Sequence, residues 1–552
     1  MIHSARIEEL NTRQVRALAL QMQQALLAKD EQLDAHRVQL DTQRRQLVHK
    51  QATIDKLTHE MAVLKRLKFA ARSERYGEAF NAEQKSLLEE AIDADLEALG
   101  HELARERPAP QPPAAAKEQP KRQPLPASLP RREIRHEPDS TTCGCGCAMK
   151  RIGEDVAEKL DYVPGAFTVE RHIRGKWVCA QCETLVQAPV PAHVIDKGLP
   201  TTGLLAQVLV AKYADHLPLY RQEAIFERAG MTLSRSTLAQ WVGACGVQLQ
   251  PLVDALKAAL LSRAVLHADE TPVAMLKPGS GKTHRAYLWS YGTTAFDPIK
   301  GVVFDFAETR AGRHVQAFLG TDRADASSNG SSNGSSSGSS SGWRGTLVCD
   351  DYAGYKALFG GQIVEAGCLA HARRKFFDLW VNHQSTVAEQ ALTFFHDLYK
   401  VERQVQDLQV DERRRIRQLK AQPVADALQA WLTAQRQKVP PGSATAKAID
   451  YSLTRWTALT RYLGDGNLPA DNNWIENRIR PIALGRANWL FAGSLRAGQR
   501  AAAIMSLIGS AKMNDLDPYV YLKDVLERLP THPARRIEEL LPHRWRSTTP
   551  LH

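Results

Sequence analysis

The segment from residue 264 to residue 355 follows a pattern that few folds accommodate. Three apolar runs rich in aromatic and β-branched residues predict three strands, namely AVLHADETPV, RAYLWSYG and KGVVFDFAE. AGRHVQAFLG then predicts a short helix, and GTLVCDDYAGY predicts a fourth strand. Strands and a helix in this succession require a mixed α/β layer in which strands distant in sequence become neighbours.

Two carboxylates stand where the first and the fourth of these predicted strands end, Asp269 and Asp350. The order of elements is that of the ribonuclease-H-like fold, in which the first and fourth strands are adjacent, so we expect the two side chains to meet. Like charges a few ångströms apart repel each other unless a cation lies between them. Two Mg²⁺ ions, with Mn²⁺ as an alternative, would balance them and suit phosphodiester chemistry.

Such a site needs a third carboxylate, and Glu476 is the candidate. It lies in DNNWIENRIRPIALGRANWLFAGS, where Asn472, Glu476 and Arg480 share one helical face. Each acid also has a structural alternative, because an Asp at the end of a strand often caps a loop and Glu476 could pair with Arg480. We expect Glu270 and Asp351 to have such structural roles, and His267 to be a packed histidine rather than a substrate contact.

Five of the eight cysteines fall between residues 143 and 182, in CGCGC and in CAQC. Two cysteine pairs on separate turns can close a tetrahedral thiolate site around one Zn²⁺. The intervening EKLDYVPGAFTVERHIRGKWVC predicts two strands, so we expect a zinc ribbon. The expected ligands are Cys143, Cys145, Cys179 and Cys182, with Cys147 in reserve because three cysteines compete for two positions. Unligated buried thiols are the alternative.

The first 100 residues predict a long helix, since they are rich in Gln, Leu, Glu and Lys. Its heptad positions are Leu26, Leu33, Leu40, Leu47, Ile54 and Met61, joined near the end by Leu57 and Leu64. The pattern favours a coiled coil that joins copies of the chain, with packing on its own protein as the alternative. Pro-rich residues 108–130 predict a semi-extended linker, and the Ser/Gly run at 327–342 predicts a flexible surface loop.

A formal net charge of +11 favours a polyanionic partner such as nucleic acid. LPLYRQEAIFERAGMTLSRSTLAQWVGACG predicts helix, turn, helix, with a second helix that ends near Val242. A plain helical hairpin is the alternative. The basic runs HARRKF and DERRRIRQLK could grip phosphates or be solvated helix faces. The candidate DNA contacts are Arg235, Gln240, Arg373, Arg374, Arg480 and Arg486.

HADETPV, CDDYAGY, CLAHARRKF and DNNWIENRIRPIALGRANWLFAGS together resemble the IS66 family of insertion-sequence transposases. IGEDVAEKLDYVP and KFAARSERYG extend the resemblance over residues 45–530 or so. It implies a DDE recombinase that cuts DNA at the ends of an element and joins the freed 3′-hydroxyls to target DNA. Asp269, Asp350 and Glu476 stand at the three acids of the family, the N-terminal helix matches its leucine zipper, and the cysteine segment matches its zinc region.

The expected architecture is an α/β multidomain protein: a ribonuclease-H-like catalytic core with an all-α insertion, preceded by a coiled-coil helix, a zinc ribbon and a helix-turn-helix. The expected boundaries are coiled coil 1–100, linker 101–138, ribbon 139–192, helix-turn-helix 193–258, catalytic domain 259–520 with an insertion at about 371–465, and tail 521–552.

The expected partners are terminal inverted repeats, target DNA, further copies of the chain and accessory proteins of the element. We expect no membrane span and no secretory signal, hence a bacterial cytoplasmic, nucleoid-associated protein. The competing functions are a DNA-binding regulator without chemistry and a structure-specific nuclease of the same fold.

Overall fold

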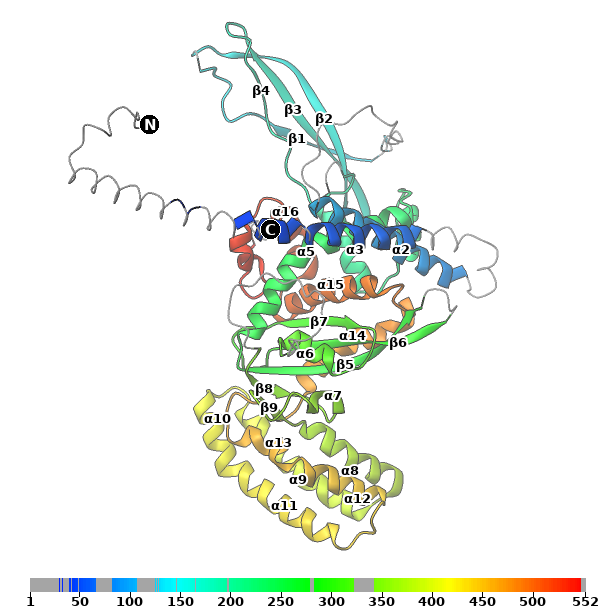
Figure 1. The fold of residues 1–552 in the computed structure, drawn as a ribbon, viewed down its shortest axis with the longest axis vertical. Helices are drawn as coiled ribbons and strands as arrows, with labels where there is room; N and C mark the ends of the chain where they lie inside the picture. The colour runs from blue at the N-terminus through cyan, green and yellow to red at the C-terminus, as the bar shows by residue number, and fades with distance from the viewer. Residues whose placement is uncertain are drawn as a thin grey trace, which may run out of the picture. The chain divides into compact units, whose positions relative to one another are not determined.

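The computed structural model (Figure 1) describes residues 29, 32, 39–40, 42–47, 49–65, 82–106, 125, 127, 129–144, 146–163, 165–195, 198–277, 282–321 and 342–547. The chain forms two compact units, one of residues 1–66 with 99–118 and one of residues 67–98 with 119–552. Leu26, Leu33, the Ser/Gly run up to residue 341 and most of the Pro-rich segment lie outside the described residues.

In the first unit, two helical segments of the same chain pack on each other. Residues 49–65 are helical, and α2 spans Ala82–Glu106. Leu57, Leu99 and Leu103 form a buried cluster. In one straight helix Leu57 and Leu99 would be about 60 Å apart, at about 1.5 Å per residue. The prediction of a single long helix over residues 1–100 is therefore wrong.

The heptad residues at the end of the first segment are covered by α2, because Ile54, Met61 and Leu64 pack on the same cluster. This is the packing on the protein itself that the sequence left as the alternative. Leu40 and Leu47 are 63% and 68% exposed. Self-association through these residues stays a prediction.

The second unit contains a β-ribbon. Its strands are β1 (Arg131–His136), β2 (Met149–Val163), β3 (Ala166–Cys179) and β4 (Leu185–Gln187). β2 and β3 pair antiparallel over their whole length, which confirms the two strands predicted between the cysteine pairs. Gly165, with φ of +92°, is at the turn between them, where a residue without Cβ is favoured.

Three helices follow: α3 (Thr202–Tyr213), α4 (Leu219–Arg228) and α5 (Arg235–Leu261). The predicted turn is present, since Gly230 has φ of +84° and Ser234 Oγ accepts a hydrogen bond from the N–H of Thr237 (3.2 Å). However, α5 does not end near Val242. Its apolar face continues to Leu260 and belongs to the same hydrophobic core as the sheet that follows.

That sheet has five strands in the order β7-β6-β5-β8-β9. They are β5 (Val265–Leu276), β6 (Thr283–Gly292), β7 (Val302–Ala307), β8 (Gly345–Val348) and β9 (Ile363–Ala366), with α6 (Arg313–Leu319) and α7 (Ala353–Lys356) between strands. The first three are antiparallel, whereas β5, β8 and β9 run parallel. The first and fourth strands are neighbours as expected. β5, however, extends seven residues beyond Asp269 instead of ending there.

Two helices from the C-terminal part cover the sheet, α14 (Asn473–Trp489) and α15 (Leu495–Met513). The helix α16 (Pro518–Arg528) packs on α3, and the 3₁₀ helix η5 (Ala534–Leu540) packs on α5. α15 packs on β7, the edge strand (Figure 1). The hydroxyls of Ser506 and Ser510 accept hydrogen bonds from the backbone N–H groups of Phe304 (2.8 Å) and Val302 (2.9 Å). These side chains satisfy an edge that would otherwise present unpaired backbone groups.

A second hydrophobic core belongs to the helices inserted between β9 and α14. These are α8 (Leu369–His383), α9 (Thr386–Val405), α10 (Val410–Ile416), η3 (Arg417–Ala421), α11 (Gln422–Arg436), α12 (Ala444–Thr454), α13 (Trp456–Thr460) and η4 (Arg461–Leu463).

Two arginines of the basic run DERRRIRQLK hold this insertion together instead of facing solvent. Arg417 is fully buried, pairs with Glu402 (2.6 Å) and donates to three backbone carbonyls. Arg413 donates to the carbonyl of Gly466 (2.6 Å). Among the described helices, none is long and apolar enough to cross a membrane.

The part of α2 that belongs to the second unit is held against the core by buried ion pairs. Asp95 pairs with Arg500 (2.9 Å), and Glu90 pairs with Lys212 and accepts from the N–H of Leu219 (3.1 Å). The backbones of α2 and α5 approach so closely that glycine is required at position 243, because a Cβ at Gly243 would lie 2.3 Å from the carbonyl oxygen of Ala94.

We predict that Gly243→Ala lowers the free energy of unfolding by about 1–3 kcal/mol, the usual cost of overpacking. The clash with a backbone atom outweighs the gain of about 1 kcal/mol that Ala normally gives over Gly in a helix. Chemical denaturation measures this, with Gly361→Ala as control because its added Cβ meets no atom within 4 Å. A Gly243→Ala chain as stable as the wild type would contradict the close approach of α2.

Candidate functional site

Strand pairing brings the first two candidate acids to neighbouring positions. β5 pairs with β8 through Val265–Thr346, Leu266–Leu347 and His267–Val348. Two residues further along each strand, the same register sets Asp269 beside Asp350. The Asp350 carboxylate also accepts a hydrogen bond from the N–H of Tyr352 (2.9 Å), which fixes the turn after β8.

The third acid, Glu476, is in the first turn of α14, and Asn472 fixes the start of that helix on β5. The Asn472 side chain donates from Nδ2 to the carbonyl of Ala268 (2.9 Å) and accepts at Oδ1 from Nδ1 of His267 (2.7 Å). Asn472 and His267 are fully buried. Glu476 is therefore carried by a helix whose N-cap residue is bonded to the strand of Asp269.

The carboxylates are close enough to perturb one another. Burial raises the pKa of Asp269 well above its ordinary value, and the nearby charges of Glu270, Glu476 and Asp350 raise it further. The arrangement favours a bound proton or a bound cation at this position.

The adjacent carboxylates are already engaged in structural contacts, as expected. Glu270 pairs with Arg310 and accepts a hydrogen bond from Tyr355 Oη (2.6 Å). Asp351 pairs with Lys356 (2.9 Å) and Arg455. These bonds set Glu270 and Asp351 apart from Asp269 and Asp350, their neighbours in sequence.

His267 is the packed histidine that the sequence favoured. Burial lowers its pKa to about 4, so its ring is neutral. Because Asn472 Nδ2 donates to a carbonyl, Asn472 Oδ1 must accept, and His267 therefore carries its proton on Nδ1. The role of this histidine is to hold Asn472.

Two residues beside Glu476 were not singled out from the sequence as part of any site. Cys368 is the residue directly before α8, and His371 lies in the first turn of that helix. Cys368, His371 and Glu476 offer ligand atoms that all lie within 4.8 Å of one another. The Cys-x-x-His spacing in CLAHARRKF is a metal-ligand signal that could have drawn attention to them.

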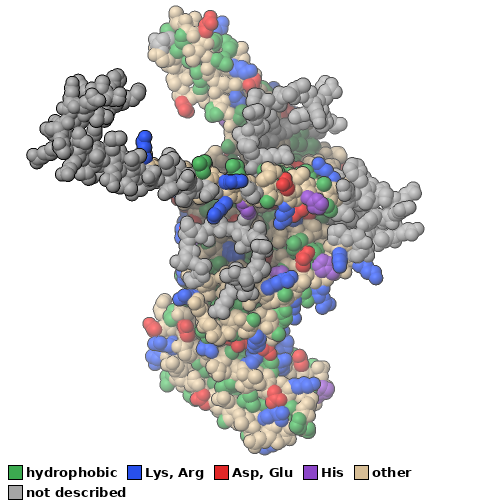
Figure 2. All heavy atoms as spheres, in the orientation of Figure 1, with side chains coloured by type: hydrophobic (Ala, Val, Ile, Leu, Met, Phe, Trp, Pro, Cys, Tyr) green, Lys and Arg blue, Asp and Glu red, His purple; other side chains and the backbone are tan. Residues whose placement is uncertain are grey.

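The candidate DNA contacts are spread over several elements. Gln240, Arg373, Arg374 and Arg480 are exposed, whereas Arg235 is half-buried at the start of α5, where its N–H donates to Glu223 (3.1 Å). Figure 2 shows Lys and Arg side chains distributed over the visible face among Asp and Glu.

Arg486 bonds to the β5 backbone at the carbonyl of Pro272 and to its own helix at the carbonyl of Ala483 (2.9 Å). The structure gives this residue a role in holding α14 on the sheet.

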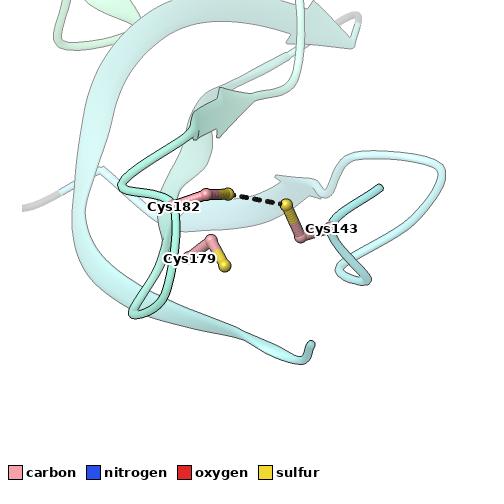
Figure 3. Close-up of side chains that lie close together, drawn as sticks. All are labelled: Cys143, Cys179 and Cys182. Carbon is pink, nitrogen blue, oxygen red and sulfur yellow. Dashed lines mark hydrogen bonds between the residues drawn. The ribbon is translucent and has the colours of Figure 1, made fainter. Parts of the chain in front are cut away.

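Three of the candidate zinc ligands converge at the end of the β-ribbon. Cys143, Cys179 and Cys182 have their sulfur atoms within 4.8 Å of one another, and the Cys143 and Cys182 sulfurs are 3.0 Å apart (Figure 3). Contacts with Cys143 and Thr184 lower the pKa of Cys182 to about 6, which favours the thiolate that binds metal.

The loop that carries Cys143 folds back tightly on itself. The N–H of Cys143 donates to the carbonyl of Cys147 (2.9 Å), and Gly146 has φ of +85°. Cys147 is half-buried and packs on the same cluster, although it is not in the group of three. Cys145 lies outside the described residues, so the fourth ligand stays open between these two.

Sequence comparison identifies the family of this chain. The profile of the IS66 transposase family matches residues 197–500, and that of the IS66 C-terminal element matches residues 506–543. The chain belongs to the IS66 family of transposases. The zinc-finger binding domain of transposase IS66 matches residues 140–183, and the profile described as transposase C of IS166 homeodomain matches residues 56–134.

Relatives of similar length occur in Sinorhizobium fredii (strain NBRC 101917 / NGR234). The uncharacterized protein y4jD is 37% identical over 439 residues, which cover 77% of this chain and 82% of y4jD. The uncharacterized protein y4qI is 37% identical over 506 residues, which cover 89% and 88%. Family membership supports a transposase role on DNA, and suggests zinc and a divalent metal as cofactors.

The raised pKa of Asp269 predicts that Asp269→Asn stabilises the IS66 protein at neutral pH when divalent cations are removed. The folded pKa lies above the unfolded one, so the favourable contribution of this carboxyl is complete below the unfolded value and is lost as pH rises through the folded value. Above that point the charged carboxylate opposes folding, and an isosteric amide does not.

Melting temperatures of both chains in chelator, measured from acidic to mildly basic pH, check this prediction. The advantage of Asp269→Asn should grow as pH rises. An advantage independent of pH, or a loss of stability at neutral pH, would contradict the crowding of carboxylates around Asp269.

We also predict about one zinc ion per purified chain, and its loss in the double variant Cys179→Ser with Cys182→Ser. Metal analysis by mass spectrometry measures the ratio. Cys245→Ser is the matched control, because Cys245 is a buried cysteine of α5 outside the group of three. Equal zinc in the double variant and the wild type would exclude the ribbon as the zinc site.

Proposed function

We propose that this IS66 protein is a DDE transposase whose five-stranded sheet is a ribonuclease-H-like core. The strand order β7-β6-β5-β8-β9, with an antiparallel first half and a parallel second half, supports this assignment. The domain boundaries of the sequence analysis are part of this proposal. The helices between β9 and α14 are then an insertion between the second and the third acid.

The observation that carries the proposal is the grouping of three carboxylates from separate parts of the chain. Asp269 comes from β5, Asp350 from the turn after β8 and Glu476 from α14, and the charges of the last two act on the first. Glu270 and Asp351, the adjacent carboxylates in the sequence, are neutralised by Arg310, Lys356 and Arg455. In the part of the chain that the structure describes, no Arg or Lys forms an ion pair with these three acids, and Glu476 pairs only with the His371 ring (3.6 Å).

This donor set fits hard divalent cations such as Mg²⁺, or Mn²⁺ as an alternative, because carboxylate oxygens are their preferred ligands and cations relieve the crowding. Asp269, Asp350 and Glu476 would hold two ions. When bound, such ions supply Lewis-acid activation of an attacking oxygen and stabilisation of a leaving oxygen at a phosphodiester.

The residues of the chain have defined tasks in this proposal. The three carboxylates would hold the ions beside the reacting phosphodiester, and Asn472 fixes the position of Glu476 relative to Asp269. Water attacks in the cleavage step and a freed 3′-hydroxyl attacks in strand transfer, so one site serves both. No covalent bond between protein and DNA is required.

DNA is the proposed substrate, at the terminal inverted repeats and at the target. Gln240, Arg373, Arg374 and Arg480 are the exposed candidates for contacting it, and Arg235 is a half-buried one. The zinc ribbon and the α3–α5 segment are proposed DNA-binding parts, the N-terminal helices a site of self-association, and accessory proteins of the element further partners. Action on DNA implies association with the nucleoid.

The decisive experiment is cleavage of DNA that carries the ends of the element, with Mg²⁺ as the added cation. Asp269→Asn, Asp350→Asn and Glu476→Gln should each reduce cleavage by at least about 10²–10³-fold, the scale for removing one electrostatic catalytic group. Binding of the same DNA, measured by gel shift, should be retained.

Asp351→Asn is the matched control, because it changes an acid next to Asp350 that is engaged in ion pairs. It should retain cleavage. A catalytically silent wild type that still binds the ends would favour a DNA-binding regulator, and cleavage without joining to a target plasmid would favour a nuclease. Full activity in any one of the three acid variants would remove that residue from the site.

A further inference from the structure

Beside the proposed catalytic carboxylates, a thiol, an imidazole and a carboxylate converge from two helices. Cys368 and His371 belong to the start of α8, and Glu476 belongs to the start of α14. Their ligand atoms all lie within 4.8 Å of one another. Among the described residues, the other such group is the cysteine set of the ribbon.

The His371–Glu476 contact has the separation of two ligands of one metal ion. His371 Nδ1 and Glu476 Oε1 are 3.6 Å apart, which is too long for a hydrogen bond. Both atoms are buried and have no hydrogen-bond partner among the described residues. Two light-atom ligands of tetrahedral zinc, each about 2.0–2.2 Å from the ion, are about 3.3–3.6 Å apart.

The sulfur of Cys368 is already oriented for such a role. It is fully buried, and it accepts a hydrogen bond from the N–H of Asn472 (3.2 Å). Burial raises the pKa of this thiol to about 12, so a cation must displace its proton on binding. The sulfur lies within 4.8 Å of both other ligand atoms, and ligands of one tetrahedral zinc ion are about 3.5 Å apart, so binding would draw the three atoms together.

We propose that Cys368, His371 and Glu476 form a site for a thiophilic divalent cation of the Zn²⁺ class, separate from the site in the ribbon. One thiolate and one carboxylate balance the two positive charges, and the imidazole is a neutral third ligand. A fourth position stays open for water or for an anion. Mg²⁺ is excluded from this site by its preference for oxygen ligands.

Occupation of this site has a consequence for the reaction, which rests on the proposed function. Glu476 Oε1 is the oxygen that faces His371, so a cation held by Cys368 and His371 takes this oxygen and competes with the Mg²⁺ site for the orientation of the carboxylate. The thiophilic cation therefore acts as an inhibitor that competes for the third acid. Binding of the thiophilic cation and Mg²⁺-dependent cleavage both require the Glu476 side chain, so one excludes the other.

Binding is tested with Co²⁺, which gives a thiolate-to-cobalt charge-transfer band and strong visible bands when tetrahedral. The full chain, with zinc already in the ribbon, should bind about one additional Co²⁺ with that band. Cys368→Ser should lose the additional ion, because its hydroxyl can still accept from Asn472 but is a poor metal ligand. Cys245→Ser, a buried cysteine elsewhere, should keep it.

A second variant tests the same site independently, in case Cys368→Ser does not fold. His371→Gln should weaken Co²⁺ binding at this site at least about tenfold, since it removes one of three ligands. The same cobalt spectrum in wild type, Cys368→Ser and His371→Gln, or no additional ion in the wild type, would overturn the proposal and leave a histidine–carboxylate pair.

Inhibition is tested by adding Zn²⁺ to the cleavage reaction at fixed Mg²⁺, with each chain compared with its own rate before addition. Zn²⁺ should inhibit the wild type and not Cys368→Ser. Equal inhibition of both chains would overturn the regulatory part. A wild type without any Mg²⁺-dependent cleavage would refute the proposed function instead, while the cobalt titration would still decide whether the metal site exists.

Discussion

The buried side chain of Asn472 holds together the parts of the chain that carry the candidate site. Its amide bonds to the carbonyl of Ala268 and to His267, directly before Asp269, and its backbone N–H bonds to Cys368. One residue thus joins β5, the start of α8 and the start of α14. Because these groups are buried, breaking any bond leaves an unsatisfied polar atom at a cost of about 1–3 kcal/mol. The geometry around Glu476 depends on this one residue.

The carboxylates of the site differ in whether the protein itself neutralises them. Glu270 and Asp351 both have cationic partners. Lys356 and Arg455 hold the pKa of Asp351 below its ordinary value, so its charge stabilises the folded chain, whereas burial still raises the pKa of Glu270. Asp269 is half-buried among like charges, and burial and these charges raise its pKa, so the folded chain holds the carboxylate form at a disadvantage. A destabilising carboxylate is retained where function needs its charge. Acids without a cationic partner therefore indicate the site better than the mere presence of Asp and Glu residues.

The sequence predicted local elements well where one periodicity dominated. The strands around Asp269, the fourth strand before Asp350, the ribbon strands and the inserted helices agree with the structure, because alternation and apolar runs are local properties. The sequence also predicted that the first and fourth strands are adjacent, because the order of elements is that of the ribonuclease-H-like fold. The extension of β5 past Asp269 was not predicted, since Pro272 and Thr271 resemble a strand end until β6 is known to pair with them.

Long-range packing accounts for the failures. Heptad spacing from Ile54 to Leu64 indicates an apolar face but does not identify its partner, and in the structure that partner includes Leu99 and Leu103 of the same chain. The basic run that contains Arg413 and Arg417 was predicted to contact phosphates or to face solvent. In the structure these two arginines donate hydrogen bonds to carbonyl groups some fifty residues away. Neither the leucines of α2 nor these carbonyl groups can be identified from a short stretch of sequence.

The same limit concealed the cysteine and histidine beside Glu476. CLAHARRKF and DNNWIENRIRP are about a hundred residues apart, and only the packing of α8 against the start of α14 brings the thiol and the imidazole to the carboxylate. Once together, they offer Glu476 a soft ligand set on one side, while Asp269 offers it a hard one on the other. Because ligand softness decides which cation each set prefers, the identity of the available metal decides which neighbours Glu476 joins.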